Sequence, residues 1–287
     1  MQNISDIMAG LQERAMKMSS LQQNEPSKHG AEYECPQCKD TEMILYIDED
    51  GYSMGRPCEC KDRKVWKRRF KNAMIPDEFT YATIENFQHD TDMQKDMHRM
   101  TTGYLDRFPA HRDALHKHGM QNFGLVADFG EQRIRRMPDE SRTAAKQEHN
   151  SFGIGKTHLQ IGLCKKLIKA GFNVLVISDV SFMDETMAAK RMSDNGETFH
   201  ELMRGVMEAD VLMWDDIGKA KPSESKEDLY YNVINERYKR KKPIVFSSNE
   251  DRGTLADRIG YAAASRLIGQ CGDYLLETKG QDWRLKR

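Results

Sequence analysis

The sequence predicts an α/β fold in which helices cover both faces of a parallel sheet, preceded by a small cysteine-bearing module. Three observations support this prediction. From residue 121 onward, short apolar runs alternate with helical stretches. A glycine-rich turn, GIGKT at 153–157, leads into a helical stretch, as phosphate-binding loops do. Four cysteines stand in two close pairs between residues 35 and 60.

Length and composition set limits on the kind of protein. A chain of 287 residues has room for one large domain and a smaller module. The 44 Lys and Arg residues are balanced by 45 Asp and Glu residues, so no global positive field indicates nucleic-acid binding, and such contacts must come from local patches. No apolar run approaches the ~20 residues that span a membrane. We therefore expect a cytoplasmic protein with no membrane partner, whose six cysteines are thiols or metal ligands rather than disulfides.

The first segment, residues 1–30, is predicted to be an amphipathic helix followed by a linker. Two interpretations of the helix stay open, because an apolar stripe can pack on its own protein or on a partner. The turn-forming stretch NEPSKHG at 24–30 forms the linker. The apolar residues at mostly helical spacing are Ile4, Ile7, Met8, Leu11, Met18 and Leu21.

The second segment, residues 31–75, is predicted to be a zinc module. Two residues separate the first pair of cysteines, nineteen residues follow, and one residue separates the second pair. Four thiolates in two pairs meet the tetrahedral requirement of structural Zn²⁺, and the stretch MILYIDEDGYSMG between the pairs has the pattern of a hairpin. The predicted zinc ligands are Cys35, Cys38, Cys58 and Cys60.

A basic stretch follows the last of these cysteines. Residues 61–71 carry seven Lys and Arg residues together with Trp66 and Phe70. This mixture suits phosphates and stacked bases of single-stranded DNA, but it also suits a solvated helix that two aromatic side chains anchor. Residues 76–120 are predicted to be a connector, much of it helical. Cys164 and Cys271 lie in the later part of the chain and are expected to be buried thiols.

Residues 121–287 are predicted to form the main domain. Short apolar runs bounded by helical stretches are typical of buried parallel strands, and five of them indicate a doubly wound sheet. The five predicted strands are residues 123–128, 173–178, 210–215, 243–248 and 274–278.

The GIGKT turn is predicted to bind a nucleoside triphosphate. Its backbone N–H groups would face the phosphates at the positive end of the following helix. Lys156 would reach the terminal phosphates, and Thr157 would bind Mg²⁺. The predicted nucleotide-binding residues are Gly130, Ser151, Phe152, Gly153, Ile154, Gly155, Lys156, Thr157 and His158.

The approach to this loop is interrupted. The pattern requires its first glycine where Asn150 stands, and the twenty preceding residues are charged and unlike a strand. If residues 131–150 are set aside, Gly130 adjoins Ser151 and the pattern is restored. We therefore predict an insert at 131–150 that bulges outward as a loop or short helix. A solvated insert costs little closure entropy, but whether it permits ATP binding, or is removed from the mature protein, stays open.

Further polar residues follow predicted strands. Asp215 and Asp216 end the run ADVLMWDDIG, where one carboxylate can hold Mg²⁺ and the other can deprotonate the attacking water. Asn249 follows the next strand and could position that water. Arg266 and Arg284 are candidates for stabilising charge on the γ-phosphate.

These motifs together resemble the AAA+ helicase loaders of bacteria and phages, the DnaC/DnaI family. The resemblance is carried by GIGKTHL, VLMWDDIG, LYYNVINERYKRKKPIVFSSN and SRL. It implies an AAA+ core without a helical lid, with Asn249 as sensor 1 and Arg284 as sensor 2. It also implies an arginine finger acting across a subunit boundary, for which Arg266 matches better than Arg258, and hence self-association.

The cysteine pattern and the following IPDEFTYATIENF resemble the amino-terminal region of DnaI-type loaders, whose zinc module engages the replicative helicase. The resemblance thus implies an ATPase that uses ATP, Mg²⁺ and Zn²⁺ and loads a hexameric ring helicase onto single-stranded DNA. Two alternatives remain. One is a transposition helper ATPase similar to IstB, which would not explain the cysteine module. The other is a zinc-bearing adaptor that does not hydrolyse ATP because the insert has disabled its nucleotide site.

Overall fold

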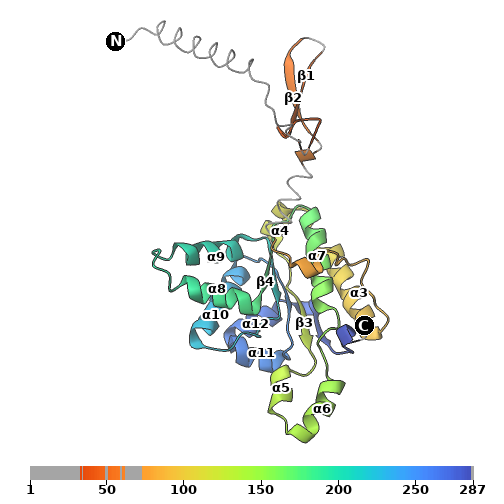
Figure 1. Cartoon of the computed structure of the whole chain (residues 1–287), viewed down its shortest axis with the longest axis vertical. Coiled ribbons are helices and arrows are strands. Elements are labelled where there is room, and N and C mark those ends of the chain that lie inside the picture. The colour runs from red at the N-terminus through yellow and green to blue at the C-terminus, as the bar shows by residue number, and fades with distance from the viewer. Residues whose placement is uncertain (1–32, 34, 49–50, 59, 62–72, 286–287) are drawn as a thin grey trace. The chain divides into compact units, whose positions relative to one another are not determined.

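The structure, a computed structural model, describes residues 33, 35–48, 51–58, 60–61 and 73–285 (Figure 1). The chain divides between Asp62 and Arg63 into two compact units, and each is described by itself. The predicted amino-terminal helix lies outside the described residues, and so does the basic stretch after Lys61. No helix within the described ranges is long and apolar enough to cross a membrane.

The smaller unit is the predicted hairpin. Strands β1 (Met43–Ile47) and β2 (Ser53–Pro57) pair antiparallel, with Met43 opposite Pro57. The four cysteines are its buried residues among those described, and the strand residues are exposed or half-buried. So little apolar burial cannot by itself stabilise a unit of this size, and a metal ion bound by the four cysteines would supply the missing free energy.

The larger unit contains a five-stranded parallel sheet with the strand order β4-β5-β6-β3-β7 (Figure 1). All five predicted strands are confirmed, with ends that differ from the prediction by one residue at most. The strands are β3 (Phe123–Ala127), β4 (Val174–Ser178), β5 (Val211–Asp215), β6 (Ile244–Ser247) and β7 (Leu275–Thr278).

Helices cover both faces of this sheet. Side chains of α3, α4 and α7 share one hydrophobic cluster on the first face, and those of α8 to α12 share another on the second face. The helices that cover the sheet are α3 (Asp92–Arg107), α4 (Arg112–His118), α7 (Lys156–Lys169), α8 (Asp179–Ala189), α9 (Glu197–Glu208), α10 (Glu224–Lys239), α11 (Arg252–Ile259) and α12 (Tyr261–Gly269). The remaining described elements are α5 (Glu131–Arg136), α6 (Asp139–Glu148) and the 3-10 turns η1 (Asp77–Phe79), η2 (Gly272–Tyr274) and η3 (Trp283–Leu285).

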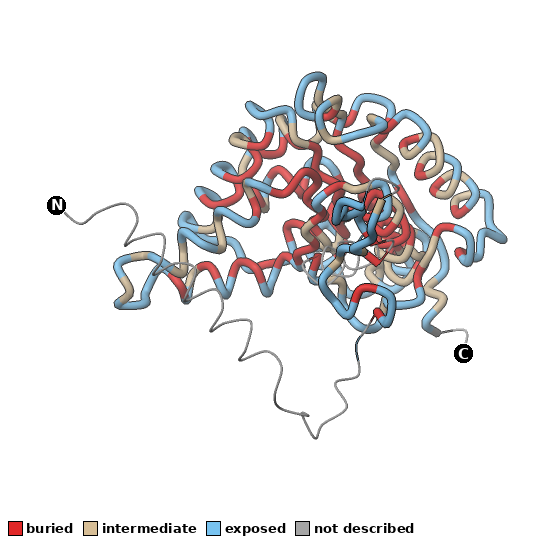
Figure 2. Tube along the Cα trace, turned by 90° about the horizontal axis from the view of Figure 1, so that it is seen from above, coloured by how far each residue is buried: buried red, intermediate tan, exposed pale blue. Residues whose placement is uncertain are grey.

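The strands feed both clusters because successive side chains of a strand point to opposite faces. In β3, Leu125 belongs to the first cluster and Val126 to the second. In β5, Met213 and Trp214 divide in the same way. Buried residues accordingly gather in the middle of the larger unit, and exposed residues lie on its outside (Figure 2). A sheet buried on both faces needs apolar side chains at every position, which is why its strands were continuous apolar runs in the sequence.

The segment 76–120, expected to be a connector, belongs to the larger unit. Phe87, Met97 and Tyr104 are buried in the same cluster as β3 and α7. The hydroxyl of Tyr104 also donates a hydrogen bond to the carbonyl of Gln121, at 2.7 Å. The prediction that this segment is largely helical is confirmed by α3 and α4.

A buried arginine ties the second layer of helices to the sheet. Arg237 of α10 is fully buried, and its guanidinium donates hydrogen bonds to the carbonyls of Val206 and Pro243, both at 2.8 Å, and of Ala209 at 3.1 Å. These carbonyls belong to the end of α9 and to the approach of β6. Burial lowers the pKa of Arg237 to about 9, so the guanidinium is still charged at neutral pH.

We expect Arg237→Leu to lower the free energy of unfolding by about 3 kcal/mol, because buried carbonyls would lose their donors. Urea denaturation measures this loss. The matched control on the same helix is Lys239→Leu, since Lys239 is exposed and forms an ion pair with Glu236 on the surface. The control should shift the free energy of unfolding by less than about 0.5 kcal/mol. Equal effects of the two substitutions would show that the buried guanidinium adds nothing.

Candidate nucleotide-binding site

The predicted phosphate loop runs from Ser151 to Gly155 and leads directly into α7. Its two glycines are required by backbone geometry. Gly155 has a φ of 96°, and a Cβ at that position would lie 2.4 Å from the ring of Phe87. Gly153 has a φ of 65°, and a Cβ there would lie 1.7 Å from a carboxylate oxygen of Asp282. Other residues adopt this left-handed conformation only at a cost, so the loop depends on glycine at both positions.

Lys156 begins α7 with its side chain buried. Its ammonium donates hydrogen bonds to the carbonyl of Ser151 at 2.8 Å and to Oδ1 of Asn249 at 2.7 Å. Burial lowers the pKa of Lys156 to about 8, although the carboxylates of Asp216 and Asp215 partly oppose this effect. The site therefore holds an ammonium that gains stability when an anion arrives.

A hydroxyl and a carboxylate come together beside this lysine. Oγ1 of Thr157 donates to Oδ1 of Asp215 at 2.9 Å, and Oγ of Ser247 donates to the same oxygen at 2.7 Å. Mg²⁺ prefers oxygen ligands and usually binds one or two carboxylates together with substrate phosphates. Thr157 and Asp215, at the edge of a cavity, fit this requirement.

Asp216 adopts a backbone conformation that is rare for a residue other than glycine. Its φ is 56°, and its N–H donates to Oγ of Ser247 at 3.0 Å. Its carboxylate accepts a hydrogen bond from Nδ2 of Asn249 at 2.5 Å. Strain of this kind is common at functional sites. Burial, and then the charge of Asp215, raise the pKa of Asp216, which makes it a better proton acceptor than an exposed aspartate.

These residues line one cavity of about 880 Å³. The sequence had missed part of its wall, namely the segment 78–86 and Lys219. His158 holds that segment, because its Nε2 lies 2.9 Å from the carbonyl of Thr83 and 2.9 Å from Oδ1 of Asn86. Phe79, Tyr81 and Ala82 provide a surface that can receive a base. The lining residues are Glu78, Phe79, Tyr81, Ala82, Asn86, all residues from Ser151 to His158, Asp215, Asp216, Lys219, Asn249 and Arg284.

The three candidate arginines lie in different surroundings. Arg284 lines the cavity and is exposed. Arg266 of α12 lies outside that cavity, with its guanidinium 5.3 Å from the ring centre of Tyr231 and 5.9 Å from that of Tyr238. Arg258 is engaged by its own chain, because it donates to the carbonyls of Gly218, Lys219 and Ala220. This difference favours Arg266 over Arg258 for a role toward another subunit.

Gly130 corrects the sequence-based picture of the loop. It is not among the residues that line the cavity, and its N–H donates to Oδ2 of Asp251 at 2.8 Å. Its φ of −66° is ordinary, and a Cβ would lie 2.1 Å from the hydroxyl of Thr254. Glycine is therefore needed here for close packing against the loop after β6, rather than for contact with phosphate.

The carboxy-terminal segment holds the start of the loop, where the pattern required a glycine. Nδ2 of Asn150 donates to the carbonyl of Gly280 at 2.6 Å, and the N–H of Gly280 donates to the carbonyl of Asn150 at 2.7 Å. The N–H of Trp283 donates to the carbonyl of Gly153 at 3.1 Å. Asn150 does not have a positive φ, so no glycine is needed there.

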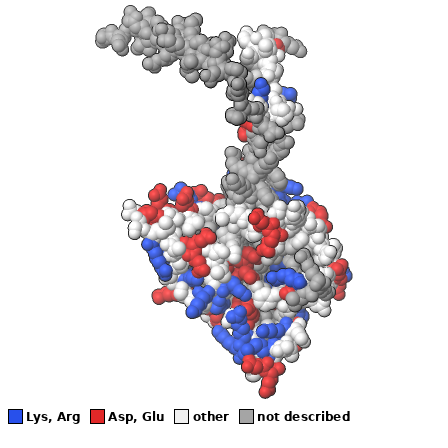
Figure 3. All heavy atoms as spheres, in the orientation of Figure 1, with Lys and Arg blue, Asp and Glu red and all other residues white. Residues whose placement is uncertain are grey.

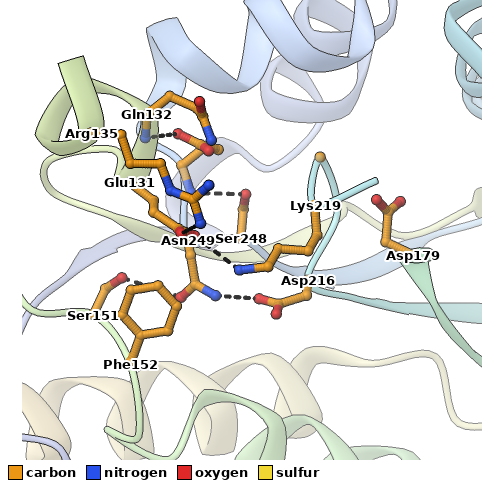
Figure 4. A network of polar contacts seen from close by, with 12 residues as sticks. Glu131, Gln132, Arg135, Ser151, Phe152, Asp179, Asp216, Lys219, Ser248 and Asn249 are labelled. Carbon is orange, nitrogen blue, oxygen red and sulfur yellow. Dashed lines mark hydrogen bonds and ion pairs between the residues drawn. The ribbon is translucent and has the colours of Figure 1, made fainter. Parts of the chain in front are cut away.

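The insert 131–150 folds as the two short helices α5 and α6, as the prediction of an outward loop or short helix allowed. Only Ile134 and Ala145 within it are buried. Lys and Arg side chains gather on the surface where Figure 1 places these helices (Figure 3). No residue of the insert lines the cavity, and Glu131 at the start of the insert forms an ion pair with the cavity-lining Lys219 (Figure 4).

The smaller unit offers a separate candidate site for a metal. The sulfur atoms of Cys35, Cys38, Cys58 and Cys60 all lie within 4.8 Å of one another, and all four side chains are buried. The distances are 3.7 Å between the sulfurs of Cys35 and Cys58 and 3.3 Å between those of Cys38 and Cys60. A tetrahedral zinc ion with Zn–S bonds of about 2.3 Å requires sulfurs about 3.8 Å apart. The cluster therefore fits zinc. Cys164 and Cys271 are buried thiols in the larger unit, as predicted.

Comparison with known proteins agrees with this geometry. Residues 149–287 match the family of IstB-like ATP-binding proteins. YqaM of Bacillus subtilis strain 168, an uncharacterised protein, is 25% identical over 325 aligned residues, which cover 97% of this chain and 93% of YqaM. The replicative helicase loader DnaC of Escherichia coli strain K12 is 24% identical over 115 residues, 40% of this chain and 46% of DnaC. A crystal structure of the DnaC helicase loader has the same fold, with a TM-score of 0.53 at 17% identity over 71% of this chain and 100% of that chain.

The lowered pKa of Lys156 predicts how nucleotide binding depends on pH. With a pKa of about 8, the free protein holds a protonated Lys156 at pH 7 and loses most of that charge by pH 9. Binding of Mg-ATP should therefore weaken about tenfold from pH 7 to pH 9, whereas a lysine of ordinary pKa would change little. Isothermal titration calorimetry at fixed ionic strength measures this. An affinity that stays constant up to pH 9 would contradict the lowered pKa.

The cysteine cluster predicts a defined metal content. Mass spectrometry of the purified chain should find about one zinc ion per molecule, and Cys58→Ser should remove most of it, because three thiolates bind zinc less tightly than four. The control is Cys164→Ala, which removes a buried thiol from the larger unit and should leave the zinc content unchanged. Equal zinc content in the Cys58→Ser protein would show that the metal lies elsewhere.

Proposed function

We propose that this chain, whose residues 149–287 match the family of IstB-like ATP-binding proteins, loads a ring-shaped replicative DNA helicase onto single-stranded DNA under the control of ATP. The observation that carries the proposal is the single cavity in which a phosphate loop, a pair of carboxylates and a sensor amide meet. Its hydrogen bonds already link Lys156 to Asn249 and Asn249 to Asp216. Such a site can bind a triphosphate and respond to its hydrolysis.

Hydrolysis of ATP follows from the roles of these side chains. The triphosphate displaces Lys156 from its internal partners, because phosphate oxygens are stronger acceptors for an ammonium than a carbonyl or an amide. Asn249 then positions a water molecule, and Asp216 accepts its proton as the water attacks the γ-phosphate. Bound Mg²⁺ would supply charge neutralisation of the phosphates, with Thr157 and Asp215 as its protein ligands. The products are ADP and phosphate.

Assembly of several subunits would complete the site. Arg266 lies outside its own nucleotide cavity and donates a hydrogen bond to one carbonyl, that of Ala262 in its own helix, whereas Arg258 donates to three carbonyls. In the proposed assembly it approaches the γ-phosphate held by a neighbouring subunit, where a guanidinium stabilises developing charge. Arg284, which lines the cavity of its own chain, acts as the second sensor. ATP binding would thereby control subunit contacts.

The smaller unit would engage the helicase. This part of the proposal rests on the resemblance of the cysteine pattern to DnaI-type loaders, and the four-sulfur cluster supports it because it can fix a small unit with little apolar core. Single-stranded DNA would be bound by the larger unit in its assembled form. The basic stretch after Cys60 is a second candidate for that contact.

A transposition helper ATPase similar to IstB is the second candidate function. The match of residues 149–287 favours it, because the matched family is that of the IstB-like ATP-binding proteins. The cysteine cluster lies outside the matched residues and favours the loader. An adaptor that does not hydrolyse ATP is less favoured, because a cavity remains beside the insert and all residues from Ser151 to His158 line it.

We expect the full chain to co-purify with the host's hexameric replicative helicase and to place it on single-stranded DNA circles only with ATP. The direct measurement is helicase bound to DNA after gel filtration, with ATP turnover recorded in the same samples. Lys156→Ala should abolish nucleotide binding and loading, because it removes the ammonium at the start of the helix that the phosphate loop presents to the phosphates. Lys226→Ala is the matched control, since Lys226 pairs with Asp184 outside the cavity.

The outcomes separate the candidate functions. Failure to bind the helicase, together with ATP-dependent assembly on duplex DNA and with a transposase, would establish the IstB-like function instead. Stable helicase binding without ATP turnover, together with turnover that appears when residues 131–150 are removed, would support the adaptor. Nucleotide binding that Lys156→Ala leaves unchanged would contradict the role of the phosphate loop.

A further inference from the structure

We propose that Lys219 is a second lysine that contacts the terminal phosphate of ATP, and that Glu131 of the insert holds it in place. This inference rests on the proposed binding of ATP in the same cavity. It assigns a function to the insert, which the phosphate-loop pattern alone leaves as an interruption. Lys219 would be a phosphate-binding residue, and Glu131 would be a positioning residue.

The position of Lys219 is the first observation. It lies in the loop after β5, three residues beyond Asp216, and lines the nucleotide cavity together with Lys156 and Arg284. Its ammonium lies 5.4 Å from the ring centre of Phe152, which belongs to the phosphate loop. Its side chain is 37% exposed, so it is accessible to a ligand in the cavity. Figure 4 shows it extending from the loop after β5 toward Glu131.

The γ-phosphate is the part of the nucleotide that must lie nearest to Lys219. Hydrolysis requires this phosphate beside Asp216 and Asn249, which activate and position the water. Lys219 lines the same cavity as Lys156, Asp216 and Asn249, so its ammonium lies on the wall of the space that would hold this phosphate. ADP places no phosphate there, so a contact from Lys219 would distinguish ATP from ADP.

Glu131 is the partner of Lys219 in the structure. Its carboxylate is 14% exposed and accepts a hydrogen bond from the ammonium of Lys219 at 2.9 Å. It also forms an ion pair with Arg135, on the next turn of α5. Burial alone would raise the pKa of Glu131, but the hydrogen bonds and charges of Lys219 and Arg135 outweigh this effect and lower it. The carboxylate is therefore ionised at neutral pH and can hold the ammonium.

The first turn of the insert is hydrogen-bonded to the loop after β6, which carries Asn249. The N–H of Glu131 donates to the carbonyl of Asn249 at 2.9 Å, and the N–H of Gln132 donates to the carboxylate of Glu250 at 3.1 Å. Arg133 pairs with Asp251, at 2.5 and 3.1 Å. Three consecutive residues of the loop after β6 thus bind three consecutive residues of the insert. Glu131 and the sensor amide belong to one rigid block, so the insert fixes Lys219 relative to the residues that activate water.

The test compares a triphosphate with a diphosphate on the full chain. Dissociation constants of the non-hydrolysable ATP analogue AMPPNP and of ADP, both with Mg²⁺, are measured by calorimetry. Lys219→Gln should weaken AMPPNP binding about tenfold and ADP binding less than about twofold, because a charge-assisted hydrogen bond to the γ-phosphate is lost. Lys219→Arg should retain most of the preference, since it keeps the charge. A thermal unfolding curve of each variant confirms that it is folded.

Arg135→Gln is the matched control. Arg135 pairs with the same carboxylate as Lys219 but does not line the nucleotide cavity. It should leave both dissociation constants within about twofold of the unaltered chain. An equal loss of AMPPNP affinity in the Arg135→Gln and Lys219→Gln proteins would reduce the effect to surface charge and overturn the assignment of Lys219.

The role of Glu131 is tested by a double-mutant cycle. Glu131→Gln should lower the preference for AMPPNP over ADP about threefold when residue 219 is lysine and leave it unchanged in the Lys219→Gln background. The same decrease in both backgrounds would overturn the positioning role. A raised preference would also overturn it, because it would show that Glu131 competes with phosphate for the ammonium.

Failure of this inference can be distinguished from failure of the proposed function. If the unaltered chain binds neither AMPPNP nor ADP, the nucleotide site itself is wrong and the assignment of Lys219 fails with it. If both bind, Lys156→Ala abolishes both, and Lys219→Gln weakens both equally, the nucleotide site stands and only the contact with the γ-phosphate is refuted.

Discussion

A buried ammonium is the constraint around which the nucleotide site is arranged. Lys156 lies at the first turn of a helix inside the larger unit, and burial makes its charge costly. Its hydrogen bonds to the Ser151 carbonyl and the Asn249 amide offset part of that cost. Because one end of this arrangement belongs to the phosphate loop and the other to the loop after β6, the charge ties together segments almost a hundred residues apart. In the proposed function an incoming phosphate would compete for this charge, and that competition would give nucleotide binding a direct effect on Asn249.

Much of the fold could be predicted because the relevant signals are local. A parallel sheet buried on both faces requires continuous apolar runs, and these were visible at all five strands. The GIGKT turn and the paired aspartates are local signals too. Backbone geometry restricts which residue types can occupy positions such as Gly153, Gly155 and the ends of the strands. The four cysteines were recognisable from spacing alone, and the structure gathers their sulfurs into one cluster.

The remainder of the site depends on tertiary contacts that no local pattern encodes. Phe79 and Tyr81 line the cavity because residues 73–87 pack against α7. In the sequence, this segment shows neither a helical nor a strand pattern that would indicate such packing. Lys219 and Glu131 meet across 88 positions of the chain. Gly130 was assigned to the phosphates because joining it to Ser151 restores a familiar pattern, but the structure packs it against Thr254. Setting residues 131–150 aside restores the order of residues in the motif, but it does not show where each of those residues lies in the folded chain.

The contacts of Asn150 have a mechanical consequence. In an uninterrupted phosphate loop the preceding strand delivers the chain directly to the phosphates, so the sheet serves as the anchor. Here two helices intervene, and the anchor is provided instead by the paired bonds of Asn150 with Gly280 and by the bond from Trp283 to Gly153. The residues after β7 thus hold the phosphate loop in its conformation. Displacement of these residues, for example by another molecule that binds them, would therefore weaken nucleotide binding without changing the sheet.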